Sequence, residues 1–180
     1  MVTAWGELLT DRLLVAFQDK QAFVKPVGRA TFKQAPALKR FSVSVLSKGC
    51  KEVHFDMSQC SSLDSTFMGV LAGMAMWPVK GGKKVEVTLT GLSARTRSML
   101  STLGLERIIR CYEGSPESQT DAQKAADPAV KEIQHDADKD ETLDTMRTAH
   151  QDLVRADKEN EARFCDVLTY LDQEMKRVDD

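Results

Sequence analysis

No hydrophobic run in this 180-residue sequence reaches the roughly 18 apolar residues that a membrane-spanning helix needs. The first twelve residues, MVTAWGELLTDR, carry charges and lack an apolar run followed by a cleavage site, so we expect no export signal. Aromatic residues make up only 6% of the chain, and the basic residues are scattered instead of interleaved with them, which disfavours a nucleic-acid-binding surface. We therefore expect a cytoplasmic protein with neither a membrane span nor a nucleic-acid partner.

Cysteine is scarce and dispersed. The sequence has no CxxC pair and no compact group of cysteines and histidines, so neither a zinc site nor a disulfide framework is indicated. We expect reduced thiols, as in cytoplasmic proteins, and no bound metal. The four cysteines are Cys50, Cys60, Cys111 and Cys165.

Motifs for catalysis are missing as well. No GxSxG elbow surrounds Ser65, and although Asp64 and His54 would complete a triad on paper, His54 lies inside a predicted strand. The run KGGKK, residues 80–84, lacks the spacing of a P-loop and predicts a solvated turn. We expect a protein that is not an enzyme and that binds no cofactor.

Charge is divided unevenly along the chain, although the net charge is only -2. Residues 1–114 hold 16 Lys and Arg against 9 Asp and Glu, whereas residues 115–180 hold 9 against 18. Two interpretations follow: the acidic tail folds back over the basic domain, or each half meets a different partner.

The first 114 residues carry a pattern typical of an α/β domain. Short segments rich in Val, Leu and Phe predict strands over 13–19, 22–28, 51–57 and 83–91, with a last apolar piece near Ile108. Helical spacing predicts helices after Pro36, after Asp64 and from about Ser93. This order favours a mixed β-sheet covered by α-helices. Pro26 has no backbone donor, so we expect its strand to be irregular or exposed on one side there.

The remaining residues predict an appendage. Residues 115–140 are rich in Ala, Asp, Ser, Gln and Lys and read as an acidic linker, and residues 141–180 read as a long amphipathic C-terminal helix. His150, Asp157 and Asn160 interrupt its apolar stripe, so we expect the helix to dock by its better end, near Phe164 and Leu171. Self-association or partner binding through this helix are further possibilities.

The stretch SSLDSTFMGVLAG, residues 61–73, places Asp64, Ser65 and Thr66 at the start of a helix. One of these side chains is expected to cap the helix, because the first backbone N–H groups have no intrahelical partner. The same N-terminus is also a favourable place for a phosphate group. Gly69 and Gly73 share a helical face, and we expect them to let the helix approach its strand closely.

The segment VHFDMSQCSSLDSTFMGVLAG resembles the core signature of the STAS domain, found in bacterial anti-sigma factor antagonists and in the cytoplasmic part of sulfate transporters. The resemblance covers roughly residues 11–114 and implies the STAS fold. It also implies that Ser65 matches the serine that a partner kinase phosphorylates, Asp64 the acidic residue before it, and Asp56 the residue at the preceding strand end. Phe67 departs from the glycine that many antagonists have there.

The resemblance further implies a phosphoprotein that regulates transcription by partner switching. Its partners would be a serine-kinase anti-sigma factor, which supplies the ATP, and a phosphatase. The expected contact surface includes Asp56, Asp64, Ser65, Thr66, Phe67 and Met68. The alternative is a ligand-sensing or scaffold STAS module without phosphorylation.

Overall fold

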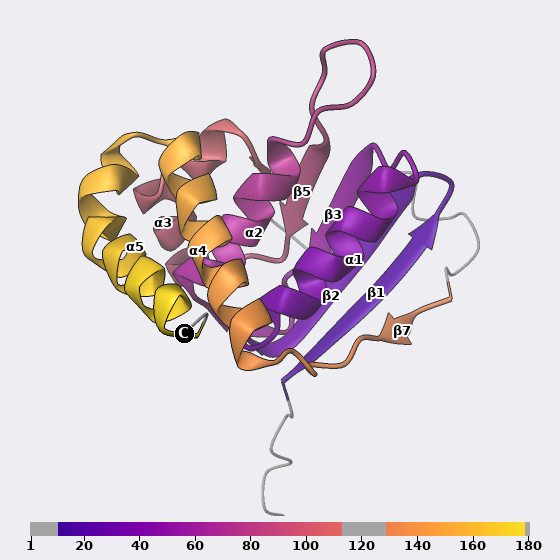
Figure 1. Ribbon diagram of the computed structural model, residues 1–180. Coiled ribbons are helices and arrows are strands. Elements are labelled where there is room, and N and C mark those ends of the chain that lie inside the picture. Colours follow the sequence, from indigo (N-terminus) through magenta and orange to yellow (C-terminus); the bar gives the residue numbers. More distant parts are fainter. Residues whose placement is uncertain (1–10, 113–128, 179–180) are drawn as a thin grey trace, which may run out of the picture.

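The computed structural model describes residues 11–112 and 129–178. One mixed sheet runs in the order β6-β5-β3-β2-β1-β7, with β4 paired to β2, and helices cover it (Figure 1). The strands are β1 (Arg12–Gln18), β2 (Gln21–Ala30), β3 (Glu52–Asp56), β4 (Cys60–Leu63), β5 (Glu86–Thr90), β6 (Arg110–Cys111) and β7 (Lys131–Glu132). The helices are α1 (Ala35–Ser47), α2 (Ser65–Ala75), α3 (Ala94–Thr102), α4 (Lys139–Ala156) and α5 (Glu159–Val178), with a 3-10 turn at Leu105–Arg107.

The sheet confirms the predicted α/β class. β1 and β2 form an antiparallel hairpin, whereas β2, β3, β5 and β6 run parallel to one another, as helical crossovers require. The sequence pattern missed β4, whose residues CSSL are mostly polar, and β7, which has two residues and pairs with β1. The run at residues 80–84 is an exposed turn, as predicted.

β2 changes partner around Pro26, and its register shift lies between Gly28 and Arg29. The edge of β2 that faces away from β1 pairs with β3 as far as Val24 and with β4 from Gly28 onward, so Pro26 falls between these two partners. On the other edge Pro26 lies opposite Leu13 of β1. A residue without a backbone donor is tolerated where no ladder bond is needed on that side.

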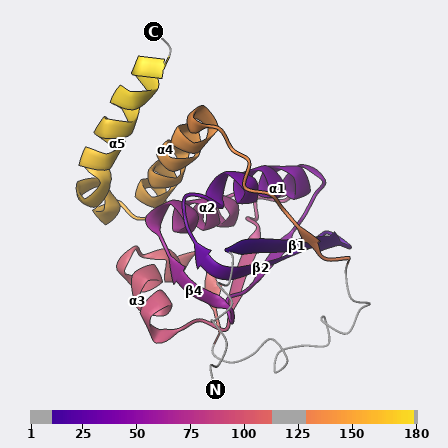
Figure 2. The ribbon, with the colours of Figure 1, turned by 90° about the horizontal axis from the view of Figure 1, so that it is seen from below.

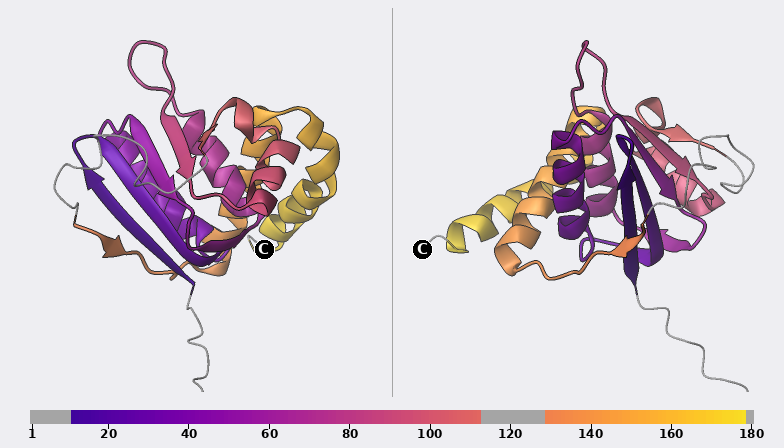
Figure 3. Two further views of the ribbon diagram at one scale, coloured as in Figure 1. Left: turned by 180° about the vertical axis from the view of Figure 1, so that it is seen from behind. Right: turned by 90° about the vertical axis from the view of Figure 1, so that its right-hand side faces the viewer.

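The helices form two layers on one face of the sheet. α1 and α2 pack directly on the strands, and α4 lies across the outer side of α2 and α1, with α5 beyond it (Figures 2 and 3). The core between sheet and helices includes fully buried Phe55, Phe67, Leu71 and Leu89. No helix in the described residues has both the length and the apolar character to cross a membrane.

The tail differs from the single long helix expected over 141–180. It contains two helices, because Asp157 adopts an extended conformation and its carboxylate accepts a hydrogen bond from the backbone N–H of Glu159. Such side-chain bonds compete with helix continuation. The expected docking near Phe164 and Leu171 is seen, because Leu171 is 1% exposed and half-buried Phe164 packs against the core, but α4 docks as well, with Leu153 fully buried. The predicted linker over 115–140 lies largely outside the described residues.

Candidate functional site

Asp64 holds the start of α2 in place. One of its carboxylate oxygens accepts a hydrogen bond from the backbone N–H of Phe67 at 2.8 Å, which is the N-cap contact. The other accepts from the backbone N–H of Phe32 at 2.6 Å and so ties α2 to the loop before α1. The expected cap is confirmed, and Asp64 also fixes where Ser65 sits.

Ser65, the first residue of α2, is half-buried and contacts the tail. Its Oγ lies 3.0 Å from Nε2 of His150 on α4. His150 Nδ1 lies 2.7 Å from the backbone carbonyl of Met146, one helical turn earlier. A carbonyl only accepts, so Nδ1 carries the proton and neutral His150 accepts the Ser65 hydroxyl proton at Nε2.

The surroundings of His150 favour this neutral form. The side chain is 3% exposed, and burial lowers its pKa below 6.5, against smaller raising effects of the Met146 carbonyl and of Asp64. The ring of Phe164 packs edge-on against it with 4.9 Å between centroids. The sequence offered only a weak signal for this pairing: His150 falls on the apolar stripe of the tail.

The three residues after Ser65 face inward. Thr66, Phe67 and Met68 are 3%, 0% and 2% exposed. The expectation that they form a contact surface therefore needs correction, because the first turn of α2 turns these side chains into the packed interior. Phe67 fills the core, in line with its departure from glycine, while Phe32, at 40% exposed, is the aromatic residue on the surface beside Asp64.

Asp56 lies at the end of β3, as expected, but its carboxylate is engaged elsewhere. It pairs with Lys25 Nζ at 2.8 Å and accepts a hydrogen bond from the backbone N–H of Ser58 at 3.0 Å. Burial raises the pKa of Asp56, but these two partners outweigh it and hold the pKa below its usual value. Among the described residues, Asp56 therefore contacts β2 and the loop after β3, not α2.

Gly69 and Gly73 let a helix approach closely, but that helix is α4. A Cβ atom on Gly69 would overlap the backbone carbonyl of Ala149, and one on Gly73 would meet the carboxylate of Asp152. The expectation that these glycines face a strand is wrong. α4 runs along the glycine face of α2 and so reaches Ser65 with His150.

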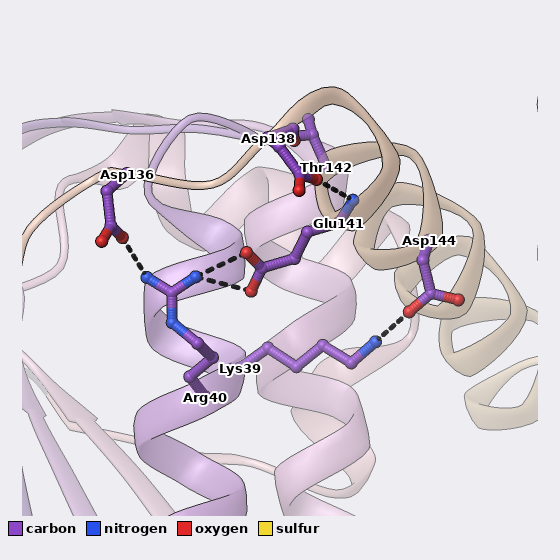
Figure 4. Close-up of polar contacts among 7 residues, drawn as sticks. All are labelled: Lys39, Arg40, Asp136, Asp138, Glu141, Thr142 and Asp144. Carbon is purple, nitrogen blue, oxygen red and sulfur yellow. Dashed lines mark hydrogen bonds and ion pairs between the residues drawn. The ribbon is translucent and has the colours of Figure 1, made fainter. Parts of the chain in front are cut away.

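Ion pairs fasten the beginning of α4 to the basic face of α1 (Figure 4). Arg40 places one nitrogen 2.6 Å from both carboxylate oxygens of Glu141 and another 2.5 Å from Asp136. Lys39 Nζ lies 2.8 Å from Asp144. The acidic tail therefore folds back over the basic domain, which is one of the two arrangements that the charge division indicated.

A second anchor lies at the turn between α4 and α5. Asn160, 1% exposed, donates from its amide to the carbonyls of Leu103 and Leu153 at 3.0 and 2.9 Å. Arg163 donates to the Thr102 carbonyl at 2.9 Å, and Arg107 pairs with Asp157 at 3.2 Å. The tail is thus held at both ends of α4, on either side of the Ser65 contact.

A cleft of about 280 Å³ opens between α1, α2 and α4, toward the other end of α2. Its walls are mainly apolar, with Val70, Met74 and Trp77 from α2 and the residues after it. The charged residues Lys39 and Asp152 also line it. Met68 and Met74 of α2 are buried, at 2% and 3% exposed.

Solved structures of anti-sigma factor antagonists have a similar fold. One from Mycobacterium paratuberculosis is 20% identical, with a TM-score of 0.50, and the match covers 64% of this chain and 94% of that one. The Bacillus cell fate determinant SpoIIAA in its phosphorylated form is 15% identical, with a TM-score of 0.47 and coverage of 59% and 94%. Unphosphorylated SpoIIAA is 12% identical, with a TM-score of 0.47 and coverage of 59% and 92%.

No curated protein matches the sequence. The profile of the family described as "Mlab, STAS domain" matches residues 13–110, which is more than half of the chain. The match spans β1 to the start of β6 and includes the whole of α2 with Asp64 and Ser65. The chain therefore belongs to the STAS domain family.

Proposed function

We propose that the protein is an anti-sigma factor antagonist controlled by phosphorylation of Ser65. The observation that carries this proposal is the place of Ser65 within a STAS domain, as the first residue of α2 directly after the capping Asp64. A helix N-terminus stabilises negative charge through its free N–H groups and its dipole. A phosphate there would add roughly 1.5 to 2 negative charges beside Asp64 without requiring the domain to unfold.

In this proposal the unmodified protein binds a serine-kinase anti-sigma factor, and the sigma factor is released. The kinase then transfers the γ-phosphoryl group of its ATP to Ser65 Oγ, which yields phosphoserine and ADP, and the modified protein leaves the kinase. A phosphatase restores the hydroxyl by hydrolysis. The nucleotide belongs to the kinase, so the chain itself would need no cofactor.

The contact between Ser65 and His150 lacks two features of a catalytic pair. A hydroxyl bonded to an imidazole is the arrangement of an activated nucleophile, which a third group normally orients. Here Nδ1 of His150 is taken by the Met146 carbonyl of its own helix, not by a carboxylate. The cleft between α1, α2 and α4 includes neither Ser65 nor His150 in its lining. We therefore propose that the protein is not an enzyme.

A second candidate function is a ligand-sensing or scaffold module without phosphorylation. The cleft of about 280 Å³ favours it, because an apolar pocket with a few polar groups is the usual form of a small-molecule site. In that case the ligand would lie against Val70 and Met74, and Ser65 would stay unmodified in the host.

Mass spectrometry of the chain isolated from its host distinguishes the two candidates. We expect phosphate on Ser65, and capture from host lysate should retain a serine-kinase anti-sigma factor with Ser65→Ala and lose it with Ser65→Asp. Ser61→Asp is the matched control, because Ser61 is exposed and precedes α2. If Ser65 carries no phosphate under any growth condition, the ligand-sensing module becomes the better proposal.

A further inference from the structure

We infer that α4 is a removable cover bound within the chain to the α1–α2 face, and that a partner must displace it to reach Ser65. This inference rests on the proposed function only in naming Ser65 as the target. It assigns to the α1–α2 face a specific kind of ligand, an acidic amphipathic helix. α4 is the occupant seen in the structure.

The fit between α4 and this face is specific. The backbone of Ala149 seats against Gly69, a contact that no residue with a Cβ atom would allow without movement. The acidic residues of α4 meet Lys39 and Arg40 of α1. Small residues on one helix allow the backbone of a second helix to come into contact with it. Complementary charges around the contact favour this arrangement.

The contact also has the composition of a separable interface. Thr145, His150, Asp152 and Asn160 are buried polar residues contributed by the tail. The hydroxyl of Thr145 and the side-chain carbonyl of Asn160 have no hydrogen-bond partner among the described residues. Buried polar groups weaken an interface relative to an apolar core, and its ion pairs are partly exposed to solvent.

The STAS fold does not require this cover. The antagonist from Mycobacterium paratuberculosis matches over 94% of its own length with only 64% of this chain. The family match here ends at residue 110, before α4 begins. A segment that lies outside the shared domain yet occupies its Ser65 face is positioned to control access to that face.

Thiol accessibility at position 65 tests the cover without any kinase. Ser65→Cys is introduced into the chain, and its alkylation by iodoacetamide is followed peptide by peptide with mass spectrometry. Exposed Cys165 serves as the fast internal reference and buried Cys50 as the slow one, because burial also raises the pKa of the Cys50 thiol. We expect the introduced thiol to react at least about tenfold more slowly than Cys165, which corresponds to about 1.4 kcal/mol of docking free energy.

Gly69→Ala, added to the same chain, should raise the rate toward that of Cys165. Alanine stabilises the interior of α2 by about 1 kcal/mol relative to glycine, so the domain itself should stay folded while α4 is expelled. Gly73→Ala is the matched control, because it meets only the movable end of Asp152 and should leave the rate low. Leu153→Asp, on α4 itself, is a second releasing variant that leaves the domain sequence intact.

The inference is overturned if the introduced thiol reacts as fast as Cys165 in the chain that carries Ser65→Cys alone. It is also overturned if both Gly69→Ala and Leu153→Asp leave the rate unchanged while β3 and β5 stay protected from amide exchange. These outcomes are separate from failure of the proposed function. If alkylation shows that α4 is released in these variants but Ser65 never carries phosphate in the host, the inference about α4 stands. The proposal of a phosphorylated antagonist is then wrong.

Discussion

Ser65 Oγ and His150 Nε2 lie 3.0 Å apart across the contact of α2 with α4, although 85 positions separate the two residues in the chain. The bond ties the hydroxyl proposed as the switch to a helix outside the family match. Any modification of Ser65 removes the proton that His150 accepts, and it places bulk and charge where α4 lies. The state of Ser65 and the position of α4 are therefore linked.

Acidification should loosen α4. His150 is buried and its pKa lies below 6.5, so an undocked tail takes up a proton before the docked one does. Docking is fully stabilised above pH 6.5, and it weakens as the pH falls from there to the docked pKa, by at most about 1.4 kcal/mol per pH unit. Amide exchange of α4 measured from pH 7.5 downward, with exchange rates corrected for pH, would show this loss.

Other charged groups near His150 define the control for that titration. Asp64 faces it from α2, and Lys39 of α1 and Arg155 of α4 lie near Asp152. Burial raises the pKa of Asp152, so its protonation favours docking at lower pH, opposite in sign to His150. His150→Gln should abolish the loss near pH 6.5. An unchanged profile in that variant would assign the loss to another group.

The Arg40–Glu141 pair should contribute modestly and in a salt-dependent way. A double-mutant cycle of Arg40→Glu and Glu141→Arg is expected to give a coupling free energy of about 0.5–1 kcal/mol at low salt. At 1 M salt the screening length is about 3 Å, so the coupling should shrink. Stability would be measured by urea unfolding.

Reversal of the Arg110–Glu86 pair is the matched control for that cycle. This pair is also partly exposed and has a 2.8 Å contact, but it joins β6 to β5 and lies outside the tail interface. Arg110→Glu should leave amide exchange of α4 unchanged, whereas Arg40→Glu, which changes the net charge by the same amount, should accelerate it. Equal effects of both reversals on α4 would mean that net charge, and not the α1–α4 contact, holds the tail.

Asn160→Ala should release the turn between α4 and α5. The substitution leaves the buried carbonyl of Leu103 without the Asn160 donor and the carbonyl of Leu153 with only the backbone N–H of Asp157, which is expected to cost about 1–3 kcal/mol. Gln173→Ala, an exposed amide on α5, is the control and should change the unfolding free energy by less than about 0.5 kcal/mol. Similar losses in the two variants would show that the Asn160 bonds contribute little.

Asp64→Ala should destabilise the domain more than Ser93→Ala does. Both remove an N-cap, a loss of about 0.5–2 kcal/mol, but Asp64 also accepts the backbone N–H of Phe32. Urea unfolding of the two variants measures the difference. If the two variants lose equal free energy of unfolding, the hydrogen bond from Phe32 to Asp64 contributes no net stability.

The sequence predicted the α/β class, the first two strands, α1–α3 and a helix cap from one of Asp64, Ser65 and Thr66, because these depend on local periodicity and on residues close in the chain. It did not predict β4, since CSSL has no alternation of apolar residues and pairs with β2 only through tertiary folding. The division of the chain near residue 114 remains a prediction. The arrangement of these elements as a STAS fold was implied by the family resemblance over roughly residues 11–114.

The site shows the limit of local patterns more sharply. Neighbouring residues in the sequence single out Asp64 and Ser65, whereas the sequence shows His150 only as an interruption of the apolar stripe of the tail. The spacing of Gly69 and Gly73 predicts a face of close contact, but the neighbour on that face is α4 and not a strand. Nothing in a helical pattern states which second helix it meets, so the contact of α4 with α2 became visible only in three dimensions.

The most direct measurement is the fraction of Ser65 that carries phosphate in the chain isolated from its host, with wild type and Gly69→Ala expressed side by side. We predict phosphate on Ser65 in both proteins and a larger fraction in Gly69→Ala, because release of α4 opens the site to the kinase. Ser65 without phosphate in either protein, under every growth condition tried, would contradict the proposal that this residue is the switch.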